Sequence, residues 1–485
     1  MNRPPMSRLP LEILSRIFRF ATAPQNILGY SRKPQLWDTY WLVEIGSVCS
    51  QWHRVTHSSP RLWSTLALHP TESLQVTHYT ALLQLHLEQV GVNGLSIYLS
   101  DWEEVHEGEI EEILNIILCE HPGKLKSLHV GDGGRGRCGV AWPLLIKYAG
   151  DDREFSELEE LELAWTPEVV EDQLNEILLF RNSPHLRALS LYGVWHPSHI
   201  PFRFPFQQLT KLQLQHISPD FALECLSKCP NLIEFSYSGF PAPWSPSDGL
   251  WDPPENESVT INSLRRLSWT ATSDKPVGIK LFDHFRFPSL HYLEWDRQLP
   301  SNAPPVHDFF AQMENLQELR FSPLLNPTKE FGIEHHLHCF RNLLKLKMPI
   351  VSEDPPLSHG WLHRLTIKPG NQNLFPHLQK LHLTTSEDGS HGLLVILCSR
   401  RNGPIDWSDP SKQYPENLVV PSYDPTSAHW KDHSRLMQFE YEASDTSIES
   451  MDWTQSPHYP ALQTMISEAK MAEGWDEASY SKIVF

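Results

Sequence analysis

Apolar residues recur along the chain in one short pattern, L-x-x-Φ-x-Φ, in which Φ is an apolar residue. The last two apolar positions lie two residues apart and therefore share one face of a β-strand. The pattern begins at Leu125, Leu158, Leu186, Leu209, Leu232, Leu264, Leu290, Leu316, Leu343, Leu362 and Leu378. Because such a strand buries its apolar face only against neighbouring copies, we predict a stack of parallel strands.

The segments between these strands have helical periodicity. Residues 172–180, 220–228 and 307–313 carry apolar residues three and four apart. Several segments end in proline just before the next leucine, as in SPHL, CPNL, FPSL and FPHL. Most repeats begin 23 to 33 residues apart, close to the period of about 20–29 residues of leucine-rich repeats. The alternative is a set of unrelated α/β units whose strands are rich in leucine.

The spacing predicts an α/β fold in which an irregular leucine-rich-repeat solenoid, with helices on its convex side, follows a small helical module. The last two spacings, 19 and 16 residues, are short, so the strand LHRLTI that begins at Leu362 is interpreted as an insertion. The predicted boundaries are a helical module at 1–70, a connecting segment and N-terminal cap at 71–120, the repeats at 121–400, and a capping or partly disordered tail at 401–485.

The N-terminal module has its own pattern. Residues 9–21, LPLEILSRIFRFA, predict a helix with one apolar stripe, and residues 39–68 contain a second stripe that ends in SSPRLW. The motifs LPxEILxxIF, VCxxW and P-x-LW together resemble the F-box over residues 7–68, especially the variant of large fungal families. The segment 22–40 departs from a compact F-box by its greater length.

This resemblance implies a three-helix module that docks on a Skp-type adaptor and, through it, on a cullin-RING ubiquitin ligase. The family's adaptor-contacting positions correspond here to Leu9, Pro10, Ile13, Leu14, Ile17, Val48, Cys49, Trp52, Leu62 and Trp63. The residues alone leave open that these helices only cap the first repeat.

An F-box in front of leucine-rich repeats resembles a substrate receptor, which holds a target protein on its repeats and leaves catalysis to its partners. The alternative is a leucine-rich-repeat scaffold for protein interactions with no role in ubiquitination.

Composition narrows the possible partners. A net charge of −19 over 485 residues disfavours a nucleic-acid binder. Seven cysteines without a C-x-x-C pair predict reduced thiols of an intracellular protein, cytoplasmic or nuclear. No run reaches the roughly 18 apolar residues that a membrane span needs. We therefore expect no nucleic acid, membrane or cofactor among its partners.

Two clusters are candidate sites of chemistry. EHHLHC at 334–339 lacks the ligand spacing of a zinc site, and GDGGRGRCG at 131–139 matches no phosphate-binding loop. The first is interpreted as a solvated helix and the second as a flexible insertion. No hydrolase, metalloprotease or kinase signature is present, so we predict neither a catalytic nor a metal site.

The repeat phase also identifies the side chains on the solvent-facing inner surface of the strands. Those of the early strands are acidic or neutral, such as Glu160 and Glu162, whereas those of the last three predicted strands include no acid. The basic positions there are Lys345, Lys347, Arg364, Lys380 and His382. We predict that they bind an acidic or phosphorylated segment of a target. The alternative is that these lysines only keep the strands soluble.

Overall fold

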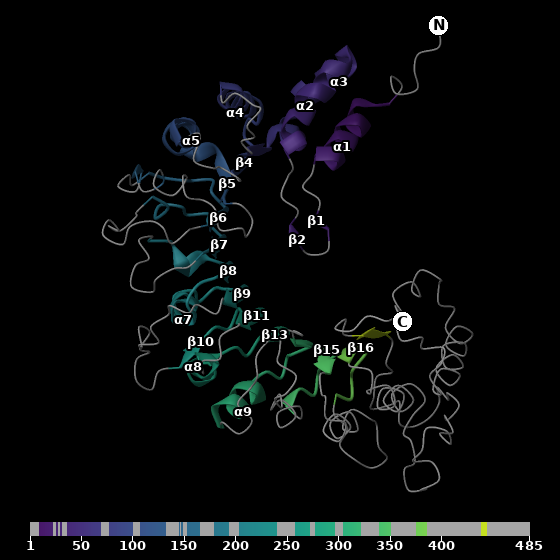
Figure 1. Cartoon of the computed structure of the whole chain (residues 1–485), viewed down its shortest axis with the longest axis vertical. Helices are drawn as coiled ribbons and strands as arrows, with labels where there is room; N and C mark the ends of the chain where they lie inside the picture. The colour runs from purple at the N-terminus through teal and green to yellow at the C-terminus, as the bar shows by residue number, and fades with distance from the viewer. Residues whose placement is uncertain are drawn as a thin grey trace, which may run out of the picture. The chain divides into compact units, whose positions relative to one another are not determined.

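The computed structural model shows two compact units, residues 1–252 and residues 253–485 (Figure 1). The structure describes residues 9–22, 26–27, 30–31, 36–68, 77–99, 107–131, 145, 147–148, 153–164, 179–193, 203–239, 258–271, 277–295, 304–321, 339–350, 375–385 and 438–443.

The first unit begins with a cluster of short helices, which form a group of their own in Figure 1. They are α1 (Leu11–Thr22), α2 (Leu36–Val48), α3 (Ser50–His57) and the 3-10 turn Pro60–Trp63. Between α1 and α2, the two short strands β1 (Asn26–Ile27) and β2 (Tyr30–Ser31) pair antiparallel. The segment that is longer than in a compact F-box therefore contains this strand pair and the start of α2.

Parallel strands then stack in the order of the sequence. They are β3 (Thr65–Leu68), β4 (Leu95–Leu99), β5 (Leu125–Val130), β6 (Glu160–Ala164), β7 (Ala188–Tyr192), β8 (Lys211–Gln215) and β9 (Glu234–Gly239). Among the described residues, α4 (Thr77–Gln89), α5 (Glu107–Asn115) and α7 (Pro219–Ser227) connect some of these strands. A π-helical turn, Ile116–Glu120, continues α5, and the 3-10 turns Pro122–Lys124 and Phe206–Gln208 precede β5 and β8. The predicted helix at 220–228 is confirmed by α7.

The register of these strands aligns their apolar residues into continuous buried rows. One row consists of Leu128, Leu161, Leu189, Leu212 and Phe235. Each of these side chains is at most 1% exposed. Burying a leucine side chain contributes about 2 kcal/mol. Stacking the strands therefore supplies the core that no single strand could form.

The stack begins earlier than the predicted boundary at residue 121. β3 and β4 lie within segments assigned from the sequence to the helical module and the connecting segment, yet they pair in parallel with each other and with β5. The register places Leu66 beside Ile97 and Ile97 beside Leu128. Three residues before Leu66, Trp63 therefore occupies the position that a leading leucine fills in the later repeats.

Proline turns and asparagine side chains join successive repeats. The Leu232 N–H donates to the Cys229 carbonyl at 3.3 Å across Pro230, and the corresponding bond to the Phe287 carbonyl is 3.2 Å. Proline has the φ that the second position of such turns requires. Asn315 donates its side-chain amide to the Pro288 carbonyl at 2.9 Å, which links one turn to the preceding turn. The predicted proline stops are thus tight turns that set each strand's start.

The second unit has the same design. Its main sheet is parallel, in the order β17-β16-β15-β14-β13-β11, and β10 pairs separately with β12. The strands are β10 (Val259–Thr260), β11 (Arg266–Ala271), β12 (Phe285–Arg286), β13 (Tyr292–Trp295), β14 (Glu318–Phe321), β15 (Lys345–Ile350), β16 (Lys380–Thr385) and β17 (Gln438–Ala443). The helices are α8 (Val277–His284) and α9 (Pro304–Ala311), and α9 covers most of the helix predicted at 307–313.

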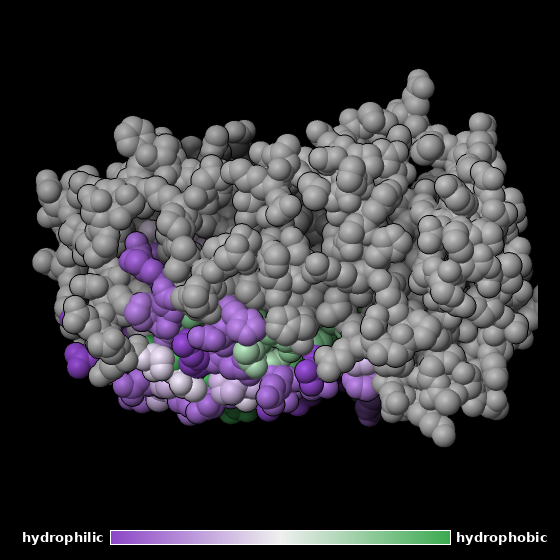
Figure 2. Space-filling model, turned by 90° about the horizontal axis from the view of Figure 1, so that it is seen from below, coloured by the Kyte–Doolittle hydropathy of each residue, from purple (hydrophilic) through white to green (hydrophobic). Residues whose placement is uncertain are grey.

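Large aromatic residues fill the core of this unit. Trp269 and Trp295 stack with ring centroids 6.2 Å apart, and Phe282 of α8 lies 5.0 Å from Trp295. The described surface seen in Figure 2 is mainly hydrophilic, with small hydrophobic areas between the polar residues. Most of the predicted tail at 401–485, the strand that begins at Leu362, and most of the predicted helix at 172–180 lie outside the described residues.

We expect Gly131→Ala to lower the free energy of unfolding by about 2 kcal/mol. Gly131 ends β5 with a φ of +152°, and an added Cβ would overlap the side chain of Ala164 at the end of β6. Urea denaturation measures the loss. The additional substitution Ala164→Gly should restore part of it by removing the overlap.

The matched control is Gly91→Ala. Gly91 also has a positive φ, +60°, but no atom lies within 4 Å of its added Cβ. Only backbone strain applies there, so the expected loss is about 1 kcal/mol. Equal losses at Gly91 and Gly131 would contradict the role assigned to the Ala164 contact.

Candidate functional site

The N-terminal helices share one hydrophobic core. Its buried members are Leu14, Phe18, Leu42, Ile45, Val55, Leu62 and Trp63. The half-buried Trp52 packs against it, with its ring edge-on to Phe18 at 5.1 Å. Leu85 of α4 packs against the same core, and α2 contacts β3, the strand at the end of the sheet. The helices therefore cover the start of the repeat stack.

Helix α1 has two apolar faces, where the sequence predicted one stripe. Leu14 and Phe18, four residues apart, point into the core, whereas Ile13 and Ile17 are each 44% exposed. Phe20, three residues after Ile17, is 66% exposed and extends the outer face. Residues three and four apart lie side by side on a helix. Contiguous apolar rows on a surface are typical of interaction sites.

Exposed apolar residues also lie on α2 and next to it. They are Trp41, Val43 and Val48, followed by the exposed Cys49. We name the outer row of α1 together with these residues the apolar helix surface; its members are Leu11, Ile13, Ile17, Phe20, Trp41, Val43, Val48 and Cys49. Four of them, Leu11, Phe20, Trp41 and Val43, were missed from the sequence, although Phe20 follows Ile13 by seven residues and continues its stripe.

The ten residues predicted to contact an adaptor divide by burial. Pro10, Ile13, Ile17, Val48 and Cys49 are exposed, and Leu9 and Trp52 are half-buried. The remaining three, Leu14, Leu62 and Trp63, lie inside the core of the helices, where the folded chain does not expose them. Charged substitutions at these three positions would therefore act on folding before they acted on docking.

Trp63 and His86 join the helices to the first repeats. The Trp63 indole N–H donates to the Thr56 carbonyl at 2.8 Å, and the Trp63 carbonyl accepts a hydrogen bond from His86 Nδ1 at 2.9 Å. His86 must therefore carry its proton on Nδ1, and its buried Nε2 has no hydrogen-bond partner among the described residues. Burial lowers the His86 pKa to about 4, and the hydrogen bond to Trp63 only partly opposes that shift.

The inner face of the first unit carries a polar cluster on β4, β5 and β6. His129 stacks on Tyr98 with centroids 4.2 Å apart, and its two nitrogens contact Ser127 Oγ and Glu162 Oε2, each at 3.0 Å. Burial, and then the charges of Glu160 and Glu162, raise the pKa of Tyr98 to about 12. This part of the face is aromatic and acidic, in agreement with the acidic character predicted for the early strands.

Ser127, His129 and Glu162 are connected in the order of a hydrolase triad, but their setting does not suit catalysis. Ser127 is 5% exposed. It also lies within β5, whose backbone is paired to β4 on one side and β6 on the other. An oxyanion formed at Ser127 would need free N–H donors, and this ladder already uses them. The cluster is better explained as a hydrogen-bonded ladder that fixes the Tyr98 and His129 rings.

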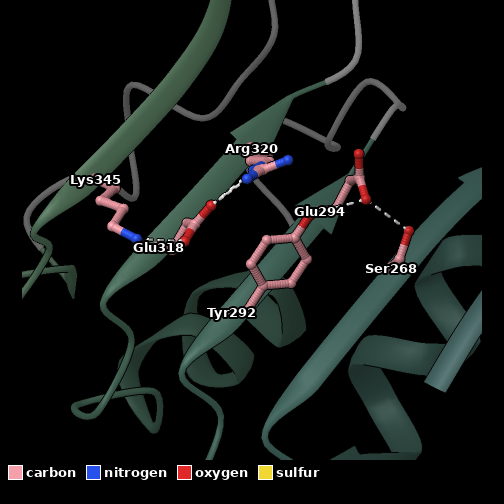
Figure 3. Close-up of polar contacts among 6 residues, drawn as sticks. All are labelled: Ser268, Tyr292, Glu294, Glu318, Arg320 and Lys345. Atoms are coloured by element: carbon pink, nitrogen blue, oxygen red, sulfur yellow. Dashed lines mark hydrogen bonds and ion pairs between the residues drawn. The ribbon is translucent and has the colours of Figure 1, made fainter. Parts of the chain in front are cut away.

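The inner face of the second unit holds a network of charged residues (Figure 3). Glu318 accepts hydrogen bonds from Arg320 at 2.7 Å and Lys345 at 3.3 Å. Burial alone would raise the pKa of Glu318, but the hydrogen bonds and charges of these two residues outweigh it and lower that pKa. Glu318 is therefore held as a carboxylate between two cations.

Tyr292 lies at the centre of this network. The guanidinium groups of Arg266 and Arg320 lie 4.2 and 5.2 Å from its ring centroid, within the range of a cation–π attraction. Its hydroxyl donates to Glu294 at 3.0 Å, and Ser268 donates to the same carboxylate oxygen at 2.9 Å. On β11, β13 and β14 the inner face is thus largely compensated in charge.

The basic residues predicted at the end of the array are only partly brought together. β15 pairs directly with β16, so Lys345 lies beside Lys380 and Lys347 beside His382. This direct pairing corrects the prediction of three consecutive basic strands; residues 362–367, Arg364 among them, lie outside the described residues. β17, which was missed, adds Gln438 beside Lys380 and Glu440 beside His382 in the register.

Neither a metal-binding group nor a membrane-spanning helix is found in the part of the chain that the structure describes. No group of three or more His, Cys, Asp or Glu residues is arranged there to hold a metal ion. Likewise, no described helix combines the length and apolarity needed to cross a membrane. Of the two sequence clusters weighed for chemistry, only Gly131 and Cys339 are described, and Cys339 lies 3.9 Å from His307.

Comparison with known proteins identifies a family for the N-terminal residues. No curated protein resembles the chain closely enough to be matched. Residues 6–69 match the model of the F-box-like family, and these residues include α1, α2, α3, the turn Pro60–Trp63 and β3. The helical core and the apolar helix surface at the start of the chain therefore belong to an F-box-like domain.

Proposed function

We propose that this protein is the substrate receptor of a Skp–cullin–F-box ubiquitin ligase. Its F-box-like domain docks on a Skp-type adaptor through the apolar helix surface, and its repeats hold a target protein. The chain itself is not an enzyme in this proposal, because the ligase partners carry out ubiquitin transfer. The observation that carries it is the exposed row of Ile13, Ile17 and Phe20 within the family match at residues 6–69.

Docking and capping are compatible in this arrangement. The inward faces of the helices, represented by Leu14 and Trp63, complete the core and cover the start of the strand stack. The outward faces remain free for a partner. A scaffold with no role in ubiquitination would need the caps but would not need an apolar row on the outside, where it favours unwanted association.

We expect Ile13→Asp with Ile17→Asp to weaken binding to a Skp-type adaptor by more than about tenfold, because each aspartate would place a charge in an apolar interface. Pull-down and titration calorimetry with purified adaptor measure this loss. Both positions are exposed in the free chain, so thermal unfolding should be nearly unchanged.

Val92→Asp is the matched control, since Val92 is a fully exposed apolar residue, at 101% exposure, outside the apolar helix surface. Its adaptor affinity should equal that of the wild type. If the wild-type chain retains no adaptor, or if the double variant binds as tightly as the wild type, the proposed function is wrong.

A further inference from the structure

Three lysines lie close together on the inner face of the second unit. Lys345 and Lys347 lie on β15, and Lys380 of β16 is the register partner of Lys345. Lys345 has one acidic partner, Glu318. Among the described residues, neither Lys347 nor Lys380 has an ion pair or a hydrogen bond from its side chain. We name Lys345, Lys347 and Lys380 the lysine cluster.

The position of the lysine cluster is unfavourable for the isolated chain. Like charges directly opposite each other on neighbouring strands destabilise a sheet, and neighbouring strands lie about 4.8 Å apart. The adjacent strands β13 and β14 avoid this cost, since each of them combines a cation or an aromatic ring with a carboxylate. The lysine cluster breaks that rule in a chain whose net charge is −19.

Glu318 illustrates how a carboxylate binds between two cations on this face, an arrangement that Lys347 and Lys380 lack among the described residues. Its carboxylate lies between Arg320 and Lys345, and its side chain is 18% exposed. Figure 3 shows Lys345 reaching toward this carboxylate from the next strand. A carboxylate supplied from outside would find the same kind of partners one strand further along, at Lys347 and Lys380.

We propose that the lysine cluster binds an acidic segment of the target protein, and that Glu318 competes with this segment for Lys345. The proposal deepens the target-binding part of the proposed function and does not depend on adaptor docking. The competition grades the response: a single carboxylate can pair with Lys347 and Lys380, whereas a segment with several carboxylates can also draw Lys345 away from Glu318.

The size of the cluster favours a protein segment over a nucleic acid. Three lysines on two strands span roughly 10 Å, which matches two or three acidic side chains. A nucleic-acid site needs a long basic stripe to neutralise many phosphates, and the acidic excess of the chain would repel such a polyanion.

The test uses a fluorescein-labelled peptide of alternating glutamate and serine, titrated with the full chain and followed by fluorescence anisotropy. Lys347→Glu with Lys380→Glu should weaken binding by about fivefold or more, because two attractions become repulsions. Glu318→Gln should strengthen it by about two- to fivefold, because Lys345 loses its internal partner. Lys211→Glu is the control, since Lys211 is an exposed lysine on β8 in the first unit, and it should leave the affinity unchanged.

Several results would overturn the inference. The first is unchanged peptide binding by the Lys347→Glu, Lys380→Glu variant, or an equal loss of binding with Lys211→Glu. The second is weaker peptide binding by Glu318→Gln. The third is a single-stranded oligonucleotide of equal charge that binds about tenfold more tightly than the peptide. Adaptor capture by the same double variant separates the two proposals. If the variant keeps the adaptor but the wild type ignores the peptide, only this inference fails.

Discussion

Trp63→Ala is expected to lower the free energy of unfolding by about 4 kcal/mol, the usual loss for an aromatic residue removed from a core. Trp63 is 1% exposed and belongs to the core of the F-box-like domain. The ring also contacts His86 edge-on at 5.1 Å, and its N–H satisfies the Thr56 carbonyl. Urea denaturation followed by circular dichroism measures the loss, and hydrogen exchange should show increased exchange in both α3 and α4.

The control is Trp41→Ala, which removes the same side chain from the exposed surface of α2. We expect a loss below about 1 kcal/mol there. If Trp63→Ala were as mild as Trp41→Ala, Trp63 would not hold the helices to the first repeats.

Acidification from pH 6.5 to pH 4 is expected to reduce the stability of the protein by about 3 kcal/mol through His86 alone. The His86 pKa is about 4 in the folded chain, against 6.5 for an exposed imidazole, as in the unfolded chain. Between these values the unfolded chain binds a proton that the folded chain does not. The contribution of His86 to the free energy of unfolding therefore rises with pH across this window and falls as the pH is lowered.

The His86→Asn variant isolates this contribution. An asparagine amide can donate to the Trp63 carbonyl in place of Nδ1–H, but it does not titrate. Other histidines and the carboxylates titrate in both proteins, so the difference between the two pH profiles reports His86. Parallel profiles between pH 4 and pH 6.5 would contradict the assigned role of this imidazole.

The later strands could be predicted because each contains the full L-x-x-Φ-x-Φ pattern. In β6, for example, Leu158 precedes the pair Leu161 and Leu163, and all three are fully buried. This pattern is local, since it depends only on the alternation of side chains along one strand. No knowledge of the neighbouring strand is needed to recognise it.

The first two strands were missed because neither has a leucine three residues before the first residue of its core row. In β3 that position is Trp63. In β4 the register shifts between Leu95 and Ser96, and Gly94, with a φ of +73°, stands three residues before Ile97. A tryptophan or a local irregularity can start a strand as well as a leucine, provided that the row of core residues continues. Only the pairing with β5 reveals that continuity.

The docking face was predicted only in part for a different reason. Apolar residues at positions 13, 14, 17 and 18 occupy neighbouring parts of one helix circumference, and helical spacing does not say which pair faces inward. The partners decide: Leu42, Val55 and Leu62 enclose Leu14 and Phe18. Similarly, LHRLTI matches the strand pattern, but the pattern does not tell which strands are neighbours, and β15 pairs with β16 instead.

Trp63 is both the last anchor of the F-box-like domain and the leading residue of the first repeat. The F-box-like domain and the start of the strand stack therefore share this side chain, and α2 also contacts β3. Truncating the chain between the helices and β3 would therefore uncover apolar residues on both sides of the cut.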